Sequence, residues 1–225
     1  MAMNIQNKEK KIILAVPKGR ILKEVMPILK HAGIEPEPAF FEVTDRRLRF
    51  SSNCKNIDII RVRSFDVATF LAYGAAHIAI AGSDVLEEFN HPEIYAPVDL
   101  RIGKCKLVVA AKEDTVSLSD QRQVSQLRVA TKYPKITQRY FRENGVQVDC
   151  IKLNGAMEIA PNLGLCRRIV DLVETGSTLT ANGLVEIAKV MNVSSRLAVN
   201  RAAWKMNPKL IGGWIEKIRE AAHLK

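Results

Sequence analysis

The stretch that decides the fold is Arg168-Ile169-Val170-Asp171-Leu172-Val173-Glu174-Thr175-Gly176-Ser177-Thr178-Leu179. An apolar, β-branched run ends in two acids, a turn of small residues follows, and apolar residues then recur at a helical spacing. This order predicts a strand, a tight loop and the N-terminus of a helix. A helix N-terminus offers unpaired backbone N–H groups and a partial positive charge, which together favour a bound phosphate.

The turn itself carries the groups that a phosphate needs. Gly176 has no Cβ and can adopt a positive φ, so the backbone can approach a ligand closely. Its neighbours have hydroxyls that can donate to further phosphate oxygens: Thr175, Ser177 and Thr178. Asp171 and Glu174 would repel a phosphate, so we expect them to bind ribose hydroxyls or a magnesium ion beside it. The stretch predicts a ribose 5-phosphate site; the alternative is an acidic strand end before a capped helix.

The whole chain has the composition of a globular protein with one large domain or two small ones. It has 225 residues, of which 47% are hydrophobic and 26% charged, and both fractions are ordinary for soluble proteins. The first apolar run, residues 12–16, is cut off by Pro17 and is too short for a signal peptide. We therefore expect a cytoplasmic protein.

Cysteine, histidine and charge exclude some kinds of site. The four cysteines and four histidines are scattered, with no C-x-x-C pair, which argues against a disulfide framework or a structural zinc site. The net charge of +10 favours binding of polyanions, which could be nucleic acid, nucleotides or an acidic subunit; the alternative is charge carried on solvated faces. Only 6% of residues are aromatic, so polyphosphorylated small molecules fit as well as nucleic acid does.

Alternating buried strands and amphipathic helices predict an α/β protein. We expect two lobes: residues 1–104 with 186–225, and an inserted lobe, 105–185, that carries the phosphate loop. Residues 112–126 read as a polar loop with irregular helix, and 201–225 as a helical tail broken near Pro208 and Gly212–Gly213. The predicted strands are 12–16, 48–50, 57–62, 78–81, 107–111, 127–130, 148–153, 169–173, 184–190 and 197–199, and the predicted helices are 21–32, 64–73 and 136–144.

Further charged residues fall near the predicted strand-to-helix turns. Ligands of open α/β sheets bind beyond the carboxyl ends of the strands, where such turns lie. The alternative for any single arginine is a solvated surface charge. The candidates are Lys18, Arg20, Arg46, Arg47, Arg49, Arg61 and Arg63, with Asp84 and Glu158 as acceptors at helix starts.

Ordered motifs along nearly the whole chain resemble one family. They are the segments 15–22, 74–76, 82–86, 105–110, 130–134, 151–155, 158–161, 169–179 and 181–186. With them the chain resembles the short form of ATP phosphoribosyltransferase, the family of the first step of histidine biosynthesis. The resemblance implies a two-lobed fold like that of type II periplasmic binding proteins, with the ligand cleft between the lobes.

The resemblance also implies a reaction and a set of roles. The phosphoribosyl group of phosphoribosyl pyrophosphate (PRPP) is joined to N1 of ATP, and pyrophosphate is released with Mg²⁺ held mainly through the substrate. The loop 175–178 is expected to bind the 5-phosphate, and Asp171 and Glu174 the ribose hydroxyls. Cations are expected at the pyrophosphate and the ATP phosphates, and acids on the nucleotide side; these are Lys18, Arg20 and Arg46, and Asp84 and Glu158.

The same resemblance implies partners. We expect a homodimer that assembles with a regulatory subunit resembling histidyl-tRNA synthetase into a hetero-octamer. In the tail, Trp204, Ile211, Trp214 and Ile218 are expected to form a packing face, by default toward the core.

The chain departs from the family pattern in two places. The family usually has Asp-x-Pro-Thr-Tyr-Val-Glu before Gly-Ala-Ala-Asp, whereas Ala68, Ala72 and His77 stand at three of these positions. Ser83 occupies the place of a lysine in Gly-Lys-Asp. These changes question any role of residues 64–73 and 83 in binding charge.

Three other functions fit part of the pattern. A type I phosphoribosyltransferase of nucleotide salvage explains the 171–179 loop but not the Lys18 turn. A phosphate- or nucleotide-binding protein would need no separate sites for two polyanions. A nucleic-acid-binding module rests on net charge alone.

Overall fold

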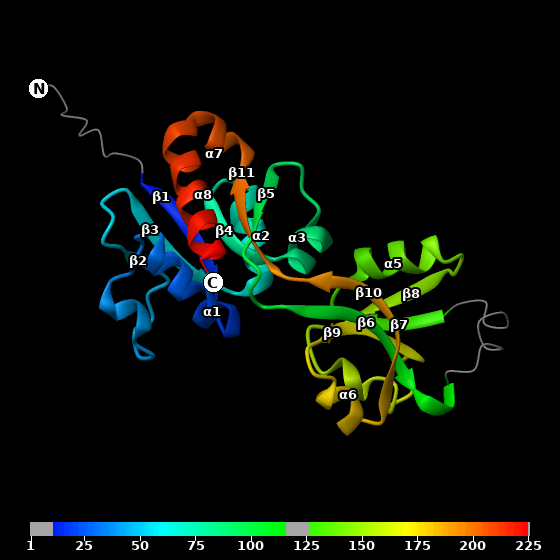
Figure 1. Cartoon of the computed structure of the whole chain (residues 1–225). Helices are drawn as coiled ribbons and strands as arrows, with labels where there is room; N and C mark the ends of the chain where they lie inside the picture. The colour runs from blue at the N-terminus through cyan, green and yellow to red at the C-terminus, as the bar shows by residue number, and fades with distance from the viewer. Residues whose placement is uncertain (1–10, 116–126, 225) are drawn as a thin grey trace, which may run out of the picture. The chain divides into compact units, whose positions relative to one another are not determined.

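The computed structural model describes residues 11–115 and 127–224 (Figure 1). The chain divides into two units, Met1–Gly103 with Ser195–Lys225, and Lys104–Ser194. The first boundary lies one residue from the predicted one. The second lies after Ser194, not after residue 185, because β10 (Leu184–Val193) pairs with β6 (Cys105–Lys112) along its whole length. Residues 186–194 therefore belong to the inserted unit.

The first unit is built on a six-stranded sheet in the order β2-β3-β1-β4-β11-β5. Its centre is parallel, since β1 pairs in parallel with both β3 and β4, while β2, β11 and β5 join by antiparallel pairing. Apolar runs such as the one in β1 are buried on both faces, as in other sheets covered by helices on two sides. The strands are β1 (Ile12–Pro17), β2 (Arg49–Ser51), β3 (Ile57–Val62), β4 (Ile78–Gly82), β5 (Ile94–Asp99) and β11 (Ser195–Asn200).

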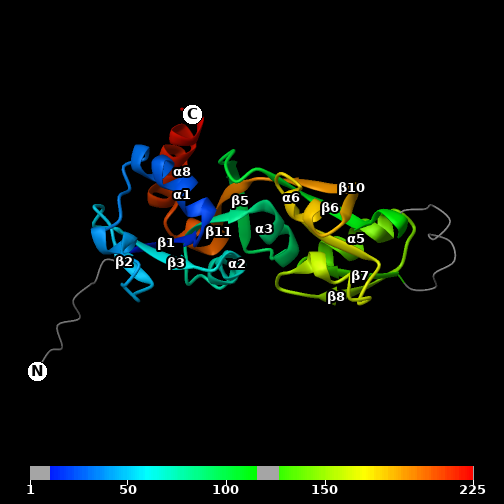
Figure 2. The same ribbon diagram turned by 90° about the horizontal axis from the view of Figure 1, so that it is seen from below.

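Helices cover both faces of this sheet (Figure 2). On one face, α1 (Arg20–His31) and α8 (Pro208–His223) pack in a cluster with residues such as Leu14 and Ile80. On the other, α2 (Ser64–Ala72) packs against Ala15 and Ala79. The shorter elements of the unit are η1 (Pro38–Phe41), α3 (Ser83–Phe89) and α7 (Arg201–Met206).

The tail is helical and packs against the core of its own unit. The predicted break near Pro208 is confirmed, because α7 ends at Met206 and α8 begins at Pro208. The predicted break at Gly212–Gly213 is wrong, because α8 continues through it. Burial of Trp214 and the apolar residues around it outweighs the helix cost of two glycines. The core packing of Ile211, Trp214 and Ile218 is confirmed, with Trp204 partly buried beside them.

The second unit is a five-stranded sheet in the order β10-β6-β9-β7-β8. The strands β7 (Leu127–Thr131), β8 (Val148–Lys152) and β9 (Arg168–Val173) are parallel, so their carboxyl ends meet at one edge of the sheet. Figure 1 shows α5 (Pro134–Glu143) on one face and α6 (Ser177–Ala181) on the other. The described part of the unit also contains the short 3₁₀ helices η2 (Glu113–Thr115) and η3 (Met157–Ile159).

The strand β5 was not predicted, because Pro97 interrupts its pattern; the residue lies at the register irregularity where this edge strand pairs with β11, a position that tolerates proline. Of the predicted polar segment 112–126, only residues 112–115 lie in the described part, and the remainder lies outside it. Among the described residues, no helix has the length and hydropathy needed to span a membrane.

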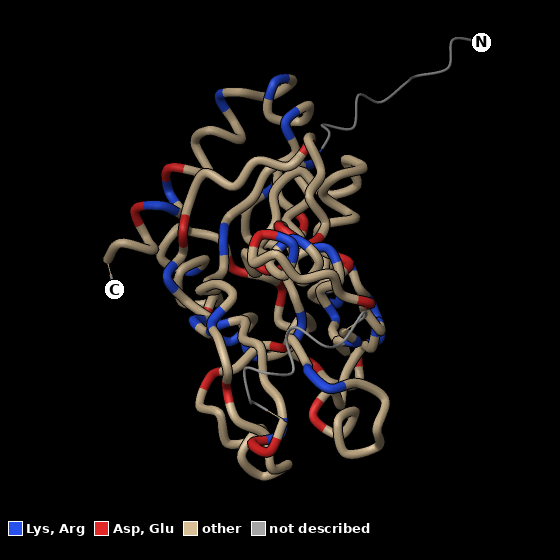
Figure 3. The backbone as a smooth tube through the Cα atoms, turned by 90° about the vertical axis from the view of Figure 1, so that its right-hand side faces the viewer, with Lys and Arg blue, Asp and Glu red and all other residues tan. Residues whose placement is uncertain are grey.

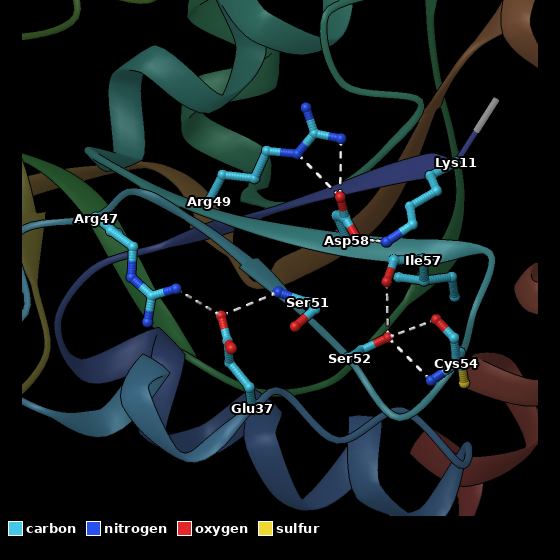
Figure 4. Close-up of polar contacts among 9 residues, drawn as sticks. All are labelled: Lys11, Glu37, Arg47, Arg49, Ser51, Ser52, Cys54, Ile57 and Asp58. Carbon is cyan, nitrogen blue, oxygen red and sulfur yellow. Dashed lines mark hydrogen bonds and ion pairs between the residues drawn. The ribbon is translucent and has the colours of Figure 1, made fainter. Parts of the chain in front are cut away.

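A buried carboxylate, Asp58, ties the edge of the first sheet together (Figure 4). It lies on β3, is 7% exposed, and accepts hydrogen bonds from Lys11 Nζ at 2.7 Å and Arg49 Nη2 at 2.8 Å. Burial opposes its ionisation, but the bonds from Lys11 and Arg49 hold the pKa of the Asp58 carboxyl below its ordinary value. A carboxyl with a lowered pKa stabilises the fold above its unfolded pKa, and this contribution is lost as the pH falls through the folded pKa.

We expect Asp58→Asn to lower the free energy of unfolding by about 2 kcal/mol near neutral pH, because two charge-assisted bonds are lost. Urea unfolding of the variant and the wild type measures this difference. The difference should shrink as acid protonates Asp58 in the wild type. The matched control is Glu216→Gln, whose exposed ion pair with Arg219 should contribute less than about 0.5 kcal/mol. Equal losses in the two variants would contradict the assignment.

Candidate active site

The acidic strand end and the loop after it enclose a small pocket in the second unit. The pocket has a volume of about 240 Å³. It forms where β9 ends and α6 begins, so the predicted strand, loop and helix are confirmed. Its lining residues are Glu158, Asp171, Leu172, Val173, Glu174, Thr175, Gly176, Thr178 and Leu179.

Gly176 gives the loop its shape. Its φ is +81° and its ψ is −3°, the left-handed conformation that glycine adopts at low cost. Its carbonyl accepts hydrogen bonds from the N–H and the hydroxyl of Thr180. On either side of it, the Thr175 and Ser177 hydroxyl oxygens lie 3.0 Å apart. The helix α6 has only five residues. The groups that could bind an anion here are therefore mainly the hydroxyls of the loop and the N–H groups of the first helical turn.

Three carboxylates line this pocket. Asp171 Oδ1 accepts a hydrogen bond of 2.8 Å from the N–H of Leu172. Burial raises the pKa of the Asp171 carboxyl, and the negative charge of Glu158 raises it further; the Leu172 bond and the positive charge of Lys132 oppose the rise. The pocket therefore brings Glu158 together with Asp171 and Glu174. Sequence reasoning had grouped Glu158 with Asp84, which belongs to the other unit.

Lys132, whose positive charge acts on Asp171, was not selected from the sequence and is not among the residues that line the pocket. It follows the last residue of β7 and is half-buried. The signal was present in the sequence, since a cation directly after a buried strand belongs to the same edge of the sheet as the acids at the end of β9.

The predicted cations of the first unit are exposed. The backbone N–H of Lys18 donates to the carbonyl of Val62 at 2.9 Å, which fixes the turn after β1. Arg20 begins α1 and lies 3.5 Å from Glu24 Oε1. Arg46 lies in the loop before β2. Within the described part of the chain, the side chains of Lys18 and Arg46 make no hydrogen bond or ion pair, which leaves both available to an anion.

Three other arginines have structural partners. Arg47 pairs with Asp45 at 2.8 Å and with Glu37 at 3.3 Å, and Arg49 pairs with Asp58 (Figure 4). Arg61 lies over the rings of Phe40 and Phe50 and donates to the Phe40 carbonyl. These contacts pair or stack Arg47, Arg49 and Arg61 within the first unit, which is neither the ligand-binding role nor the solvated surface charge expected from the sequence.

Asp84 is buried in the first turn of α3, where a carboxylate interacts favourably with the helix N-terminus. It lies so close to Gly82 that a Cβ at that position would overlap its Oδ1 atom. Glycine before Ser83-Asp84 is thus required by packing.

Residues that differ from the family pattern make contacts within the first unit. Ala68 and Ala72 are buried in α2, and Ala68 lies beside Val67 and Leu71, which pack on the sheet. His77 Nδ1 accepts a hydrogen bond of 2.8 Å from the N–H of Ile13. The backbone N–H of His77 donates to the Ile13 carbonyl at 2.9 Å. At position 77 the imidazole therefore completes the pairing of β1 with β4.

Charge and metal-binding groups are dispersed elsewhere. Figure 3 shows Lys and Arg interspersed with Asp and Glu along the tube. Among residues 11–115 and 127–224, no group of three or more His, Cys, Asp or Glu side chains is placed to hold a metal ion. A larger pocket, of about 480 Å³, includes Arg128 and Cys166, but none of the predicted site residues lines it.

Comparison with known proteins gives the family. The family model described as ATP phosphoribosyltransferase matches residues 63–220. A curated ATP phosphoribosyltransferase from Rhodospirillum rubrum is 57% identical over 221 residues, covering 98% of this chain and 97% of that protein. One from Paramagnetospirillum magneticum is 59% identical over 211 residues, covering 94% and 96%.

Solved structures agree in fold. The ATP phosphoribosyl transferase (HisG:HisZ) complex from Thermotoga maritima has a chain with a TM-score of 0.79 and 30% identity, covering 95% of this chain and all of that one. The periplasmic aliphatic sulphonate binding protein SsuA from Escherichia coli has a TM-score of 0.57 at 14% identity, covering 96% and 73%. The second likeness shows the fold alone, that of type II periplasmic binding proteins. Together with the family model and the curated relatives, these matches show that the chain belongs to the ATP phosphoribosyltransferase family.

Proposed function

We propose that this chain transfers the phosphoribosyl group of PRPP to N1 of ATP, giving phosphoribosyl-ATP and pyrophosphate in the first step of histidine biosynthesis. The observation that carries the proposal is the pocket formed by Asp171, Glu174 and the loop 175–178 in a chain of this family. A ribose 5-phosphate offers an anion for the loop and hydroxyl donors for the acids, which is the chemistry that these two groups of residues can bind.

Each half of the pocket has its own role in this proposal. The N–H groups and hydroxyls of residues 175–178 bind the 5-phosphate, and Gly176 lets the backbone approach it. Asp171 and Glu174 accept hydrogen bonds from the ribose hydroxyls. Glu158 lines the same pocket, which supports a place for it beside the ribose and not on the nucleotide side.

Lys18, Arg20 and Arg46 are the proposed cations for the pyrophosphate and the ATP phosphates. In the reaction, a bond forms between N1 of the adenine and C1 of the ribose, and the electron pair of the breaking C1–O bond leaves with pyrophosphate. Hydrogen bonds from cations strengthen as the leaving group gains charge, so they stabilise the transition state more than the bound substrates. Because the adenine nitrogen is already a nucleophile, positioning and electrostatic stabilisation provide most of the catalysis.

Magnesium enters with the substrate in this proposal. Mg²⁺ prefers oxygen ligands and is usually held by one or two carboxylates together with substrate phosphates. The carboxylates of Asp171 and Glu174 lie beside the loop that would bind a substrate phosphate, which is an arrangement of this kind. When bound, the ion would neutralise charge on the pyrophosphate.

A second kind of subunit is part of the proposal. The related Thermotoga maritima structure is a HisG:HisZ complex, and its likeness to this chain supports an assembly of the same kind here. We expect a dimer of this chain to combine with a regulatory subunit resembling histidyl-tRNA synthetase in a hetero-octamer.

The direct test is a spectrophotometric assay with ATP, PRPP, Mg²⁺ and pyrophosphatase, performed with and without the cognate regulatory subunit. Formation of phosphoribosyl-ATP that requires both substrates would support the proposal. Transfer to a free purine or pyrimidine base would favour a nucleotide-salvage enzyme instead. Tight binding of one ligand without turnover would favour a binding protein.

We expect Arg20→Ala to lower kcat/KM at least tenfold, because a charge-assisted hydrogen bond contributes about 1.5–3 kcal/mol. Steady-state kinetics with both substrates varied measures the loss. The matched control is Lys30→Ala, which removes a cation from the last turn of the same helix, about 15 Å from Arg20. Unchanged rates in Arg20→Ala would remove this residue from the mechanism.

We expect Gly176→Ala to raise the KM for PRPP roughly tenfold, because a Cβ at positive φ costs about 1–2 kcal/mol and distorts the loop. A Cβ there would make only an ordinary contact with Val173, at 3.9 Å, so the strain is local. The control is Gly164→Ala, at a φ of +70° with no atom within 4 Å of the added Cβ. Both variants should lose similar stability, measured by thermal unfolding, and an equal rise of KM in both would contradict the role of the loop.

A further inference from the structure

The side chain of Glu24 links Arg20, one of the proposed cations, to a distant part of the backbone of the first unit. Arg20 and Glu24 are four residues apart on α1, so their side chains lie on the same side of the helix. Glu24 Oε1 lies 3.5 Å from Arg20 Nε. Glu24 Oε2 accepts a hydrogen bond of 2.8 Å from the backbone N–H of Gly103. One carboxylate therefore contacts both Arg20 and a backbone group 79 residues further along the chain.

The backbone of Gly103 is fixed where Glu24 meets it. Gly103 ends the first of the two segments that form this unit, and its φ of +60° is in the left-handed region that favours glycine. A Cβ at this position would lie 2.9 Å from Ser195 Oγ and 3.3 Å from Ile21 Cγ1. The backbone N–H of Ser195 donates to the carbonyl of Ile102 at 2.9 Å, and Ile102 is buried in the core of the unit. Packing against α1 and β11 thus sets the position of the N–H that Glu24 accepts.

The pairing of Glu24 with Arg20 is expected to contribute little to the stability of the fold. The Arg20 and Glu24 side chains are 43% and 36% exposed, and ion pairs in contact with water stabilise folded proteins only slightly. A long arginine side chain in water has many rotamers, however. A carboxylate that is itself held by the Gly103 N–H restricts them by attracting Nε. The main effect of Glu24 should therefore be on the orientation of Arg20.

A contact at Nε is compatible with binding of a phosphate by the same guanidinium. A guanidinium has five N–H donors, of which Nε supplies one and the two Nη atoms supply four. Arginine binds phosphate with the greatest geometric specificity through two parallel N–H groups. Such a contact needs a defined plane of the guanidinium, so restricting Arg20 before the ligand arrives lowers the entropy cost of forming it.

We infer that Glu24 is a positioning residue of the phosphoribosyl-transfer site, whose carboxylate orients the Arg20 guanidinium to bind the departing pyrophosphate. The inference rests on the proposed function, in which Arg20 is one of the cations for the pyrophosphate and the ATP phosphates. It assigns Glu24 no contact with a substrate. Its own negative charge would repel phosphates, so any benefit to the reaction must act through Arg20.

A double-mutant cycle separates this role from a purely structural one. Glu24→Gln removes the charge that attracts Arg20 but keeps a side-chain oxygen, on a chain of the same length, that can accept from Gly103. Arg20→Ala removes the cation through which Glu24 is inferred to act, and the double variant completes the cycle. The matched control is Glu35→Gln, which removes a carboxylate from another exposed ion pair of α1, with Lys30 Nζ at 4.0 Å.

We expect Glu24→Gln to lower kcat about fivefold, measured with the regulatory subunit present, and to change the KM values for ATP and PRPP less than about twofold. The hydrogen bonds of Arg20 strengthen as the leaving group gains charge, so a misoriented guanidinium costs most in the transition state. In the Arg20→Ala background the same substitution should change kcat less than about twofold. Glu35→Gln should match the wild type, and thermal unfolding should give similar midpoints for Glu24→Gln and Glu35→Gln.

Binding of pyrophosphate measures the same coupling without turnover. Pyrophosphate with Mg²⁺ is the probe, because it carries the charge that the leaving group gains in the reaction. Isothermal titration calorimetry should give a Kd about fivefold higher in Glu24→Gln than in the wild type. This increase should disappear in the Arg20→Ala background.

Wild-type values of kcat and Kd in Glu24→Gln would overturn the inference, as would equal losses in the two backgrounds, since Glu24 would then act independently of Arg20. A higher kcat or tighter pyrophosphate binding in Glu24→Gln would also overturn it, because the carboxylate would then only compete with phosphates for Arg20. A wild-type complex that makes no phosphoribosyl-ATP, in a chain whose pyrophosphate cycle still shows the coupling, would support the action of Glu24 on Arg20 and overturn the proposed function instead. The two failures are thus distinguishable.

Discussion

The parallel pairing of β7 with β9 is the constraint on which the candidate site depends. Its register sets Thr131 opposite Val170, and the buried Thr131 hydroxyl bonds to the Val170 carbonyl. A shift of one residue would send every side chain of the strand to the other face. The side chain of Asp171 in β9 would then lie away from η3 and α6, whose residues complete the pocket. The buried Thr131 hydroxyl, at the last residue of β7, thus helps to fix the relative positions of the two strand ends that form the site.

Local chemistry explains which parts of the site could be predicted from the sequence. The order of strand, loop and helix in residues 168–179 follows from β-branched residues, a glycine at positive φ and hydroxyls at a helix start, all of which act over a few positions. Lys132 and Glu158 were missed or misplaced because their positions depend on long-range pairing. Glu158 reaches the pocket because it lies in η3. The residue before η3, Ala156, has a φ of +54°, a left-handed conformation that is not expected of an alanine.

The same distinction applies to the fold. The alternation of strands and helices was visible because buried parallel strands are nearly continuous apolar runs. The end of the inserted unit and the strand β5 were not, since both are defined by partners distant in sequence: β6 for residues 186–194, and β11 for a strand interrupted by Pro97. Likewise, arginines that look equivalent in the sequence divide into Arg46, left without a partner in the described part, and Arg47, Arg49 and Arg61, which hold the edge of the first sheet.

The position of β11 has a consequence for the order in which the chain folds. This strand lies between β4 and β5 in the first sheet, yet it is synthesised after the whole of the inserted unit, Lys104–Ser194. Until it emerges from the ribosome, β4 and β5 have no common neighbour, and the exposed edge of β4 is open to pairing with other chains. The inserted unit, whose strands are contiguous in sequence, can complete its sheet first. The unit that carries the phosphate loop would then be a folded body before the other sheet closes.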